Sequence, residues 1–107
     1  MARRYAARRD VNHSEIEAVF RQMLGDHVTD SSGWGDGAGD LFVSFGKIHH
    51  FIEIKRDDKA EYTAMQIRFQ NTHPYAVIRC DSIEDAARIS AEIRSRAMME
   101  VLSDVQV

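Results

Sequence analysis

Two acids and a lysine (Asp40, Glu53 and Lys55) are spaced so that a β-hairpin would bring them together. Residues 41–45 and 48–55 are rich in strand-forming side chains, and a Gly-Lys pair at 46–47 suits a two-residue type II′ turn between them. In that register Asp40 lies opposite Glu53. Directly opposed side chains have Cβ atoms about 4.5–5.5 Å apart, so the hairpin predicts two adjacent carboxylates.

The chemistry expected of this pair is the binding of a hard divalent cation. Like charges this close repel each other unless a proton or a cation lies between them. Lys55 follows Glu53 by two residues and therefore projects from the same face, whereas Ile52 and Ile54 point the other way into the core. Magnesium prefers oxygen ligands and could polarise a phosphoryl oxygen, beside which the Lys55 ammonium would hold a water or stabilise developing charge.

The segment before the hairpin predicts a helix followed by a loop. Apolar residues recur at helical spacing over residues 11–24, with Asn12 as the N-cap, Glu15 completing a capping box, and Gly25 as the stop. Residues 29–39 contain four of the six glycines and are expected to be irregular.

The segment after the hairpin alternates helix, strand and helix. A short helix is expected over residues 61–71, broken by His73 and Pro74, and a strand covered on both faces over 75–80. Asp81 or Ser82 would cap a final helix whose apolar stripe begins at Ile83. The expected fold class is α/β, a small mixed β-sheet with a central hairpin flanked by helices.

Composition limits the class of protein. The 107 residues carry a formal charge of −3 and are 44% hydrophobic, which fits one globular domain. No run is long enough to span a membrane and no secretory signal is apparent, so a cytoplasmic protein is expected. The single cysteine, Cys80, excludes an internal disulfide and a cysteine-built zinc site, and an inert core residue is expected there.

The basic residues are unevenly distributed. Residues 1–11 are interpreted as a basic arm preceding a single domain over 12–107. The arm would bind phosphates or act as a solubilising tail. Its arginines are Arg3, Arg4, Arg8 and Arg9.

The motif resembles that of a known superfamily. Asp40, twelve residues and then Glu53-Ile54-Lys55 is similar to the D…ExK core of the PD-(D/E)xK nucleases. The glutamates of segment 14–20, the glutamine of segment 63–67 and the strand and helix that follow resemble the VRR-NUC (virus-type replication–repair nuclease) branch. The resemblance covers residues 12–95. It departs at Gly39, where the family usually has proline.

The resemblance implies a restriction-endonuclease-like core and a Mg²⁺- or Mn²⁺-dependent DNA endonuclease. Asp40 and Glu53 would hold the metal, Lys55 would assist the nucleophile and Gln66 would orient it, although Thr63 and Gln66 also match a capping box that would leave Gln66 a purely structural role. The remaining expected metal ligands are the backbone carbonyl of Ile54 and the side chain of Glu17, with Glu15 as the alternative to Glu17.

The expected substrate is branched or otherwise structured DNA, bound by a homodimer. The alternatives are a non-catalytic DNA-binding or recombination accessory module on the same fold, and a divalent-ion-binding structural domain. Late apolar residues of the last helix would form the dimer contact or join the core: Met98, Met99, Val101 and Leu102.

Trp34 and the adjacent histidines His49 and His50 lie outside the D…ExK motif. Trp34, among glycines, would stack on an unpaired base or wedge at a branch point, or else act as a lid or anchor for its own loop. His49 and His50 are adjacent on a strand, so they face opposite sides and cannot share a metal.

Overall fold

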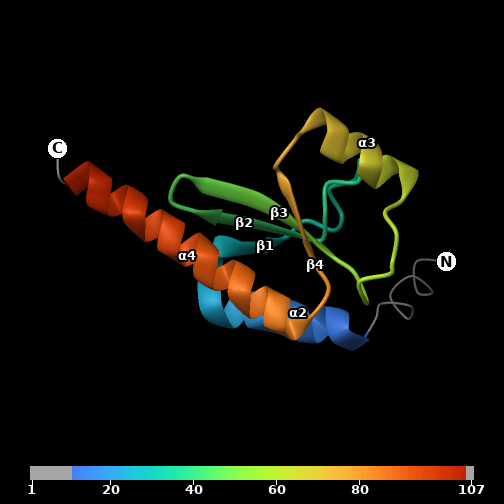
Figure 1. Cartoon of the computed structure of the whole chain (residues 1–107), viewed down its shortest axis with the longest axis horizontal. Helices are drawn as coiled ribbons and strands as arrows, with labels where there is room; N and C mark the ends of the chain where they lie inside the picture. Colours follow the sequence, from blue (N-terminus) through green and yellow to red (C-terminus); the bar gives the residue numbers. More distant parts are fainter. Residues whose placement is uncertain (1–10, 106–107) are drawn as a thin grey trace.

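The computed structural model describes residues 11–105, and the predicted basic arm with Arg3, Arg4, Arg8 and Arg9 lies outside this range. Within it, helices and strands alternate in a mixed α/β arrangement (Figure 1). In chain order the elements are α2 (Val11–Leu24), the short 3₁₀ helix η1 (Gly25–His27), β1 (Val28–Asp30), β2 (Leu41–Phe45), β3 (Ile48–Ile54), α3 (Ala64–Thr72), β4 (Val77–Cys80) and α4 (Ile83–Val105).

The four strands form one sheet in the order β1-β2-β3-β4. The first two pairings are antiparallel, and β3 and β4 are parallel, joined by a crossover through α3. The predicted mixed sheet with a central hairpin is therefore confirmed. The first strand, β1, was not predicted, because its three residues run directly into the glycine-rich loop and are too short to show an alternating pattern.

Helices α2 and α4 pack together against one face of the sheet, and α3 lies on the other side (Figure 1). The core between the sheet and α2/α4 is built from alternate strand residues, because successive strand side chains point to opposite faces. Its fully buried members include Ile16, Phe20, Leu41, Val43, Ile52 and Ile93.

The predicted hairpin register is confirmed. Phe45 pairs with Ile48 and Phe42 with Phe51, as the two-residue turn requires. Gly46 has φ +62°, which favours glycine at the first position of the turn. The same register holds along the hairpin to Leu41 and Ile52, next to the two acids. A shift by one residue would place the core side chains in solvent.

Two helix starts differ from the prediction. Helix α2 covers the predicted residues, but Asn12 lies inside it and its side-chain amide donates to the carbonyl of Arg56 at 2.9 Å. The predicted capping box of Asn12 with Glu15 is therefore wrong. Helix α3 begins at Ala64 instead of residue 61, because Thr63 is its N-cap.

The fourth strand is shorter and less covered than predicted. Tyr75 is excluded from it, with φ +70° and 91% of its surface exposed. Of β4, Cys80 is buried, whereas the preceding three residues are half-buried because β4 is an edge strand. The choice between Asp81 and Ser82 is settled by Ser82, whose hydroxyl accepts from the N–H of Asp85 at 3.0 Å.

Helix α4 continues past the hairpin turn (Figure 1). Ile83, at its start, is 41% exposed and does not join the core as predicted. Its last apolar side chains are at least half exposed and so do not join the core either: Met98, Met99, Val101 and Leu102. Among residues 11–105, no helix has the length and hydropathy needed to cross a membrane.

Candidate active site

Asp40 is held at the end of the hairpin by two backbone contacts. The last regular pair of the ladder is Leu41 with Ile52, and one position further the N–H of Asp40 donates to the carbonyl of Ile52 at 2.8 Å. Its carboxylate oxygen Oδ2 accepts from the N–H of Ile54, also at 2.8 Å. The side chain thus replaces a ladder hydrogen bond at the point where the strand ends, which fixes its position opposite Glu53.

Gly39 explains why this chain lacks proline before the aspartate. Its φ is +134°, a backbone conformation closed to proline and strained for any other L-residue. A Cβ at Gly39 would also lie 3.1 Å from the carbonyl oxygen of Ile52 and from Cβ of Phe51. Glycine therefore lets the loop turn into β2 at the point where Asp40 must meet Ile54.

Glu53 is a buried carboxyl with a raised pKa. It is 6% exposed, and its burial, followed by the charge of Asp40, raises its pKa from 4.5 to about 7, against the opposing effect of Lys55. Burial is the larger cause, and the nearby Asp40 carboxyl, which the hairpin register predicted opposite Glu53, is the second. Such a pair strongly favours a cation or a proton between its members.

Lys55 is directed at this pair by three neighbours. Its Nζ donates to Oε1 of Gln66 at 2.9 Å, lies 3.5 Å from Oε2 of Glu53, and lies 5.3 Å from the ring centre of Tyr62. Its side chain is 12% exposed. An ammonium carries three N–H donors, and two of them face Gln66 and Glu53, so one remains for a further acceptor.

Gln66 forms the capping box that its sequence context allowed, and its side chain also contacts Lys55 and Glu53. Oε1 accepts from the N–H of Thr63, and the Thr63 hydroxyl accepts from the N–H of Gln66, which completes a capping box. The same Oε1 accepts from Lys55, and Nε2 donates to Oε2 of Glu53 at 3.0 Å. The helix cap therefore fixes the amide that links the lysine to the acid.

A pocket of about 130 Å³ opens over the acidic pair. The glycine-rich loop forms one wall and approaches α3 closely, since a Cβ at Gly37 would lie 2.7 Å from the carbonyl oxygen of Met65. Its lining residues are Ser32, Gly35, Gly37, Ala38, Gly39, Asp40, Glu53 and Gln66.

Glu17 and Glu15 are not brought to this pocket. Glu17 accepts from Nε of Arg21 at 3.0 Å and lies 4.0 Å from Nε2 of His13, all on α2. Glu15 is exposed on the same helix. Within residues 11–105, no group of three or more His, Cys, Asp or Glu side chains is placed to hold a metal ion.

The oxygen ligands available at the pocket nevertheless fit a magnesium-type ion. Such ions are commonly held by one or two carboxylates with water completing the coordination. The N–H of Ile54 points toward Asp40, and in a strand the N–H and C=O of one residue point to the same side, so the carbonyl of Ile54 is directed to this end as well. The available metal ligands are therefore the carboxylates of Asp40 and Glu53 and the backbone carbonyl of Ile54.

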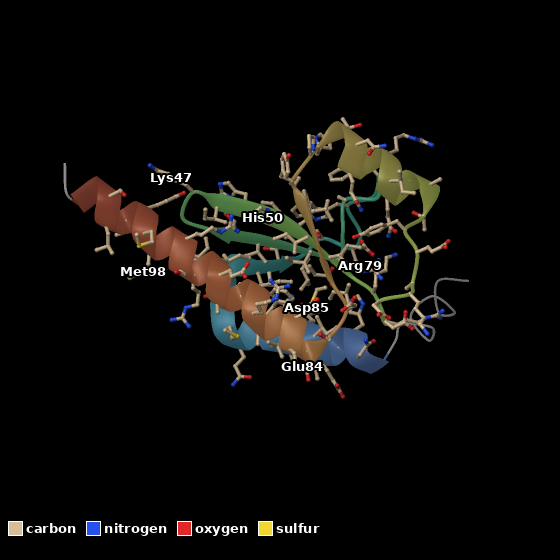
Figure 2. The ribbon with its side chains drawn as sticks, viewed as in Figure 1. Lys47, His50, Arg79, Glu84, Asp85 and Met98 are labelled. Atoms are coloured by element: carbon tan, nitrogen blue, oxygen red, sulfur yellow. The ribbon has the colours of Figure 1, made fainter. Side chains whose placement is uncertain are left out.

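Two neighbours of the site were missed by the sequence analysis. Arg79 pairs with Glu53 across the parallel strands, and its guanidinium carbon lies 5.3 Å from the ring centre of Tyr62, the ring that Lys55 also contacts. Nη2 of Arg79 donates to the carbonyl of Asp57 at 2.8 Å. Figure 2 shows Arg79 at the opposite end of the sheet from Lys47 and the hairpin turn. The register of β4 depends on the crossover through α3, so no local signal in the sequence indicated this contact.

Three other residues considered in the sequence do not line the acidic pocket: Trp34, His50 and Cys80. Trp34 is 54% exposed, with its ring centre 5.6 Å from that of Phe42. His50 lies on the α4 side, where Nη2 of Arg96 is 3.1 Å from its Nε2, and burial followed by the charge of Arg96 lowers its pKa. Burial raises the pKa of Cys80 to about 12, which supports the expected inert thiol.

Comparison with known proteins identifies the fold. One solved structure, described as a VRR_NUC domain protein, is similar with a TM-score of 0.59 and 17% sequence identity, over 78% of this chain and 88% of that one. The fold is VRR-NUC-like. No family model matches the sequence, and no curated protein matches it either. The likeness to the VRR_NUC domain protein is thus one of fold.

Proposed function

We propose that this protein is a divalent-metal-dependent endonuclease that hydrolyses DNA phosphodiester bonds, with membership of the PD-(D/E)xK superfamily. The observation that carries the proposal is the meeting of Asp40 and Glu53 beside Lys55, on the fold of a nuclease domain. An acid whose pKa is raised by burial and by a second acid is costly for a purely structural site, and such groups gather at functional sites.

In this proposal, Asp40, Glu53 and the carbonyl of Ile54 hold Mg²⁺ or Mn²⁺. When bound, the ion would supply Lewis-acid polarisation of the phosphoryl group and acidify a water. The remaining donor of Lys55 is directed to a non-bridging phosphoryl oxygen or to the attacking water, where it stabilises developing negative charge. Gln66 holds the side chains of Lys55 and Glu53 next to each other through its two hydrogen bonds. Glu17 stays a predicted ligand, although it does not line the pocket over the acidic pair.

The proposed substrate is branched or otherwise structured DNA, and the proposed assembly is a homodimer. Helix α4 supplies a candidate contact, since Met98, Met99, Val101 and Leu102 are exposed on its C-terminal part. A dimer would offer one site to each strand and two basic arms to the phosphates. A light-scattering mass of twice 12.2 kDa is expected at micromolar concentration, and a monomer mass throughout would refute the assembly.

The test of the activity is cleavage of supercoiled plasmid and of a four-way DNA junction. Cleavage is expected with Mg²⁺ or Mn²⁺ and not with Ca²⁺ or a chelator. Asp40→Asn and Lys55→Ala should reduce the rate by at least about a hundredfold, as loss of groups that stabilise the transition state does. Lys59→Ala removes the same charge from an exposed loop position and should cleave like the parent.

The second candidate function is a non-catalytic DNA-binding or accessory module. It would be supported if purified protein bound the junction but left it intact under every metal condition. It would also be supported if Lys55→Ala and the parent protein behaved alike.

A further inference from the structure

The face of the sheet opposite α2 and α4 carries a continuous row of rings, here called the aromatic face: Trp34, Phe42, His49, Phe51 and Phe69. Phe42 and Phe51 are cross-strand partners with ring centres 5.0 Å apart. Trp34 lies 5.6 Å from the first and 5.9 Å from the second. His49 stacks parallel to Phe42 at one end, and Phe69 meets Phe51 edge-on at the other.

These rings are not buried as aromatic clusters in a core are. Trp34 is 54% exposed, His49 is exposed, and the three phenylalanines are half-buried. Helices α2 and α4 both cover the opposite face of the sheet (Figure 1). Helix α3 contacts the aromatic face through Phe69, at one end of the row. Exposed apolar surface of this kind, rimmed by polar side chains, marks an interaction site.

The aromatic face leads directly into the candidate active site. Phe51 precedes Glu53 by two residues and projects from the same side of β3, about 6.6 Å further along the strand. The Phe42–Phe51 pair lies two positions along the ladder from the Asp40–Glu53 pair. Trp34 belongs to the same loop as the glycines that line the acidic pocket. A ligand on the rings is therefore within reach of a phosphodiester placed at the carboxylates.

The rings of the aromatic face offer flat apolar surfaces on which a base can stack. Asp36, two residues after Trp34 in the chain, lines a neighbouring hollow together with Arg68 and Phe69. Bases inside a duplex are already stacked on one another, so only unpaired bases can reach these rings.

We propose that the aromatic face binds unpaired bases of a DNA strand and delivers the adjoining phosphodiester to Asp40 and Glu53. This inference rests on the proposed nuclease function and adds the substrate class, DNA with a single-stranded segment. Trp34 is the outermost ring and the first to stack. Because every base has a π-face, the face is tolerant of sequence, with about 1–3 kcal/mol per stacked base.

The experiment uses Trp34 as its own reporter, because it is the single tryptophan of the chain. Full-length protein in chelator, where no hydrolysis occurs, is titrated with oligothymidylate, with an abasic strand of equal phosphate number, and with a fully paired hairpin. Saturable quenching of tryptophan emission is expected with oligothymidylate, at an affinity at least about tenfold above that of the abasic strand and the hairpin. A tenfold ratio corresponds to 1.4 kcal/mol, the lower part of the stacking range.

Variants test the same point by a different signal. Anisotropy of a labelled oligothymidylate should show at least about tenfold weaker binding for Trp34→Ala, whereas Tyr75→Ala, which removes an exposed ring elsewhere, should bind like the parent. Equal affinity for the abasic strand would overturn the proposal, as would unchanged binding by Trp34→Ala. An emission shift on dilution without DNA would also overturn it, because a second copy would then cover the rings.

Failure of this inference is distinguishable from failure of the nuclease proposal. Plasmid cleavage without base-dependent quenching would retain the hydrolase and remove the base site. Base-dependent quenching without cleavage would retain the base site and remove the hydrolase.

Discussion

The side-chain amide of Gln66 donates to the carboxylate of Glu53 at 3.0 Å, across a separation of 13 residues and between two different elements. The other end of the same amide accepts from Lys55 and from the backbone of Thr63. A residue in the first turn of a helix therefore also holds the lysine and the acid close together. The stability of α3 and the geometry of the site are linked through this side chain.

Gln66→Glu should separate the two roles of this residue. Glutamate also completes a capping box, so the free energy of unfolding should stay close to that of the parent. The donor to Glu53 is lost and a third carboxylate enters the pocket, so cleavage should fall by about 10–100-fold, as it does when residues that orient metal ligands are replaced. Plasmid nicking rates and urea unfolding are the two measurements.

The control for that prediction is Thr63→Ala. It removes the hydroxyl that accepts from the N–H of Gln66 and should cost about 0.5–2 kcal/mol of stability, while leaving the bonds of Gln66 to Lys55 and Glu53 available. If both variants lose activity and stability together, the two roles of Gln66 are not separable.

Gly39→Ala should destabilise the protein and displace Asp40. A residue with a Cβ at φ +134° is strained by about 1–3 kcal/mol, and the new Cβ would press on the carbonyl of Ile52. Urea unfolding should give that loss. Gly33→Ala, in the same loop with open space around the added Cβ, should change stability by less than about 0.5 kcal/mol. Similar losses in the two variants would contradict the argument from backbone conformation.

The stability of the metal-free protein should fall as the pH rises from about 4.5 to about 7. The pKa of Glu53 is raised from 4.5 to about 7 in the folded protein, so within this window the folded state binds its proton more tightly than the unfolded state. The contribution of this group is fully present below pH 4.5 and is lost as the pH passes 7.

The matched variant for the pH effect is Glu53→Gln, which cannot ionise. Measured by urea unfolding in chelator, its stability relative to the parent should increase with pH across the window, because only the parent acquires the buried charge. A difference between the two that does not change from pH 5 to pH 8 would show that Glu53 titrates normally.

Addition of Mg²⁺ or Mn²⁺ should raise the melting temperature of the parent protein. An ion that binds only the folded state stabilises it by about 2.7 kcal/mol at 100 times its dissociation constant, and the gain should be larger at pH 8 than at pH 6 because protons compete for Glu53. Asp40→Asn keeps an oxygen that can accept from the N–H of Ile54 but loses the charge, so its gain should be much smaller. Equal gains in the two proteins would place the metal elsewhere.

The meeting of Asp40 and Glu53, with Lys55 on the same side, followed from the sequence because the hairpin is local. A two-residue turn fixes the register, and alternation along a strand fixes the face, so no long-range packing had to be known. The helix over Val11–Leu24 was equally readable from its apolar spacing. The start of this helix was not predicted correctly, because the side chain of Asn12 donates to the carbonyl of Arg56, 44 residues away.

Tertiary structure decided which other residues join the site. It brought in Tyr62 and Arg79, which no motif indicated, and left Glu17 with Arg21 on α2. It also placed Trp34 on a row of rings beside the acids instead of in a core. These outcomes depend on the parallel register of β4 and on the packing of α2 and the glycine-rich loop. Contacts between elements far apart in the chain are set by how the whole core packs, and no local pattern encodes them.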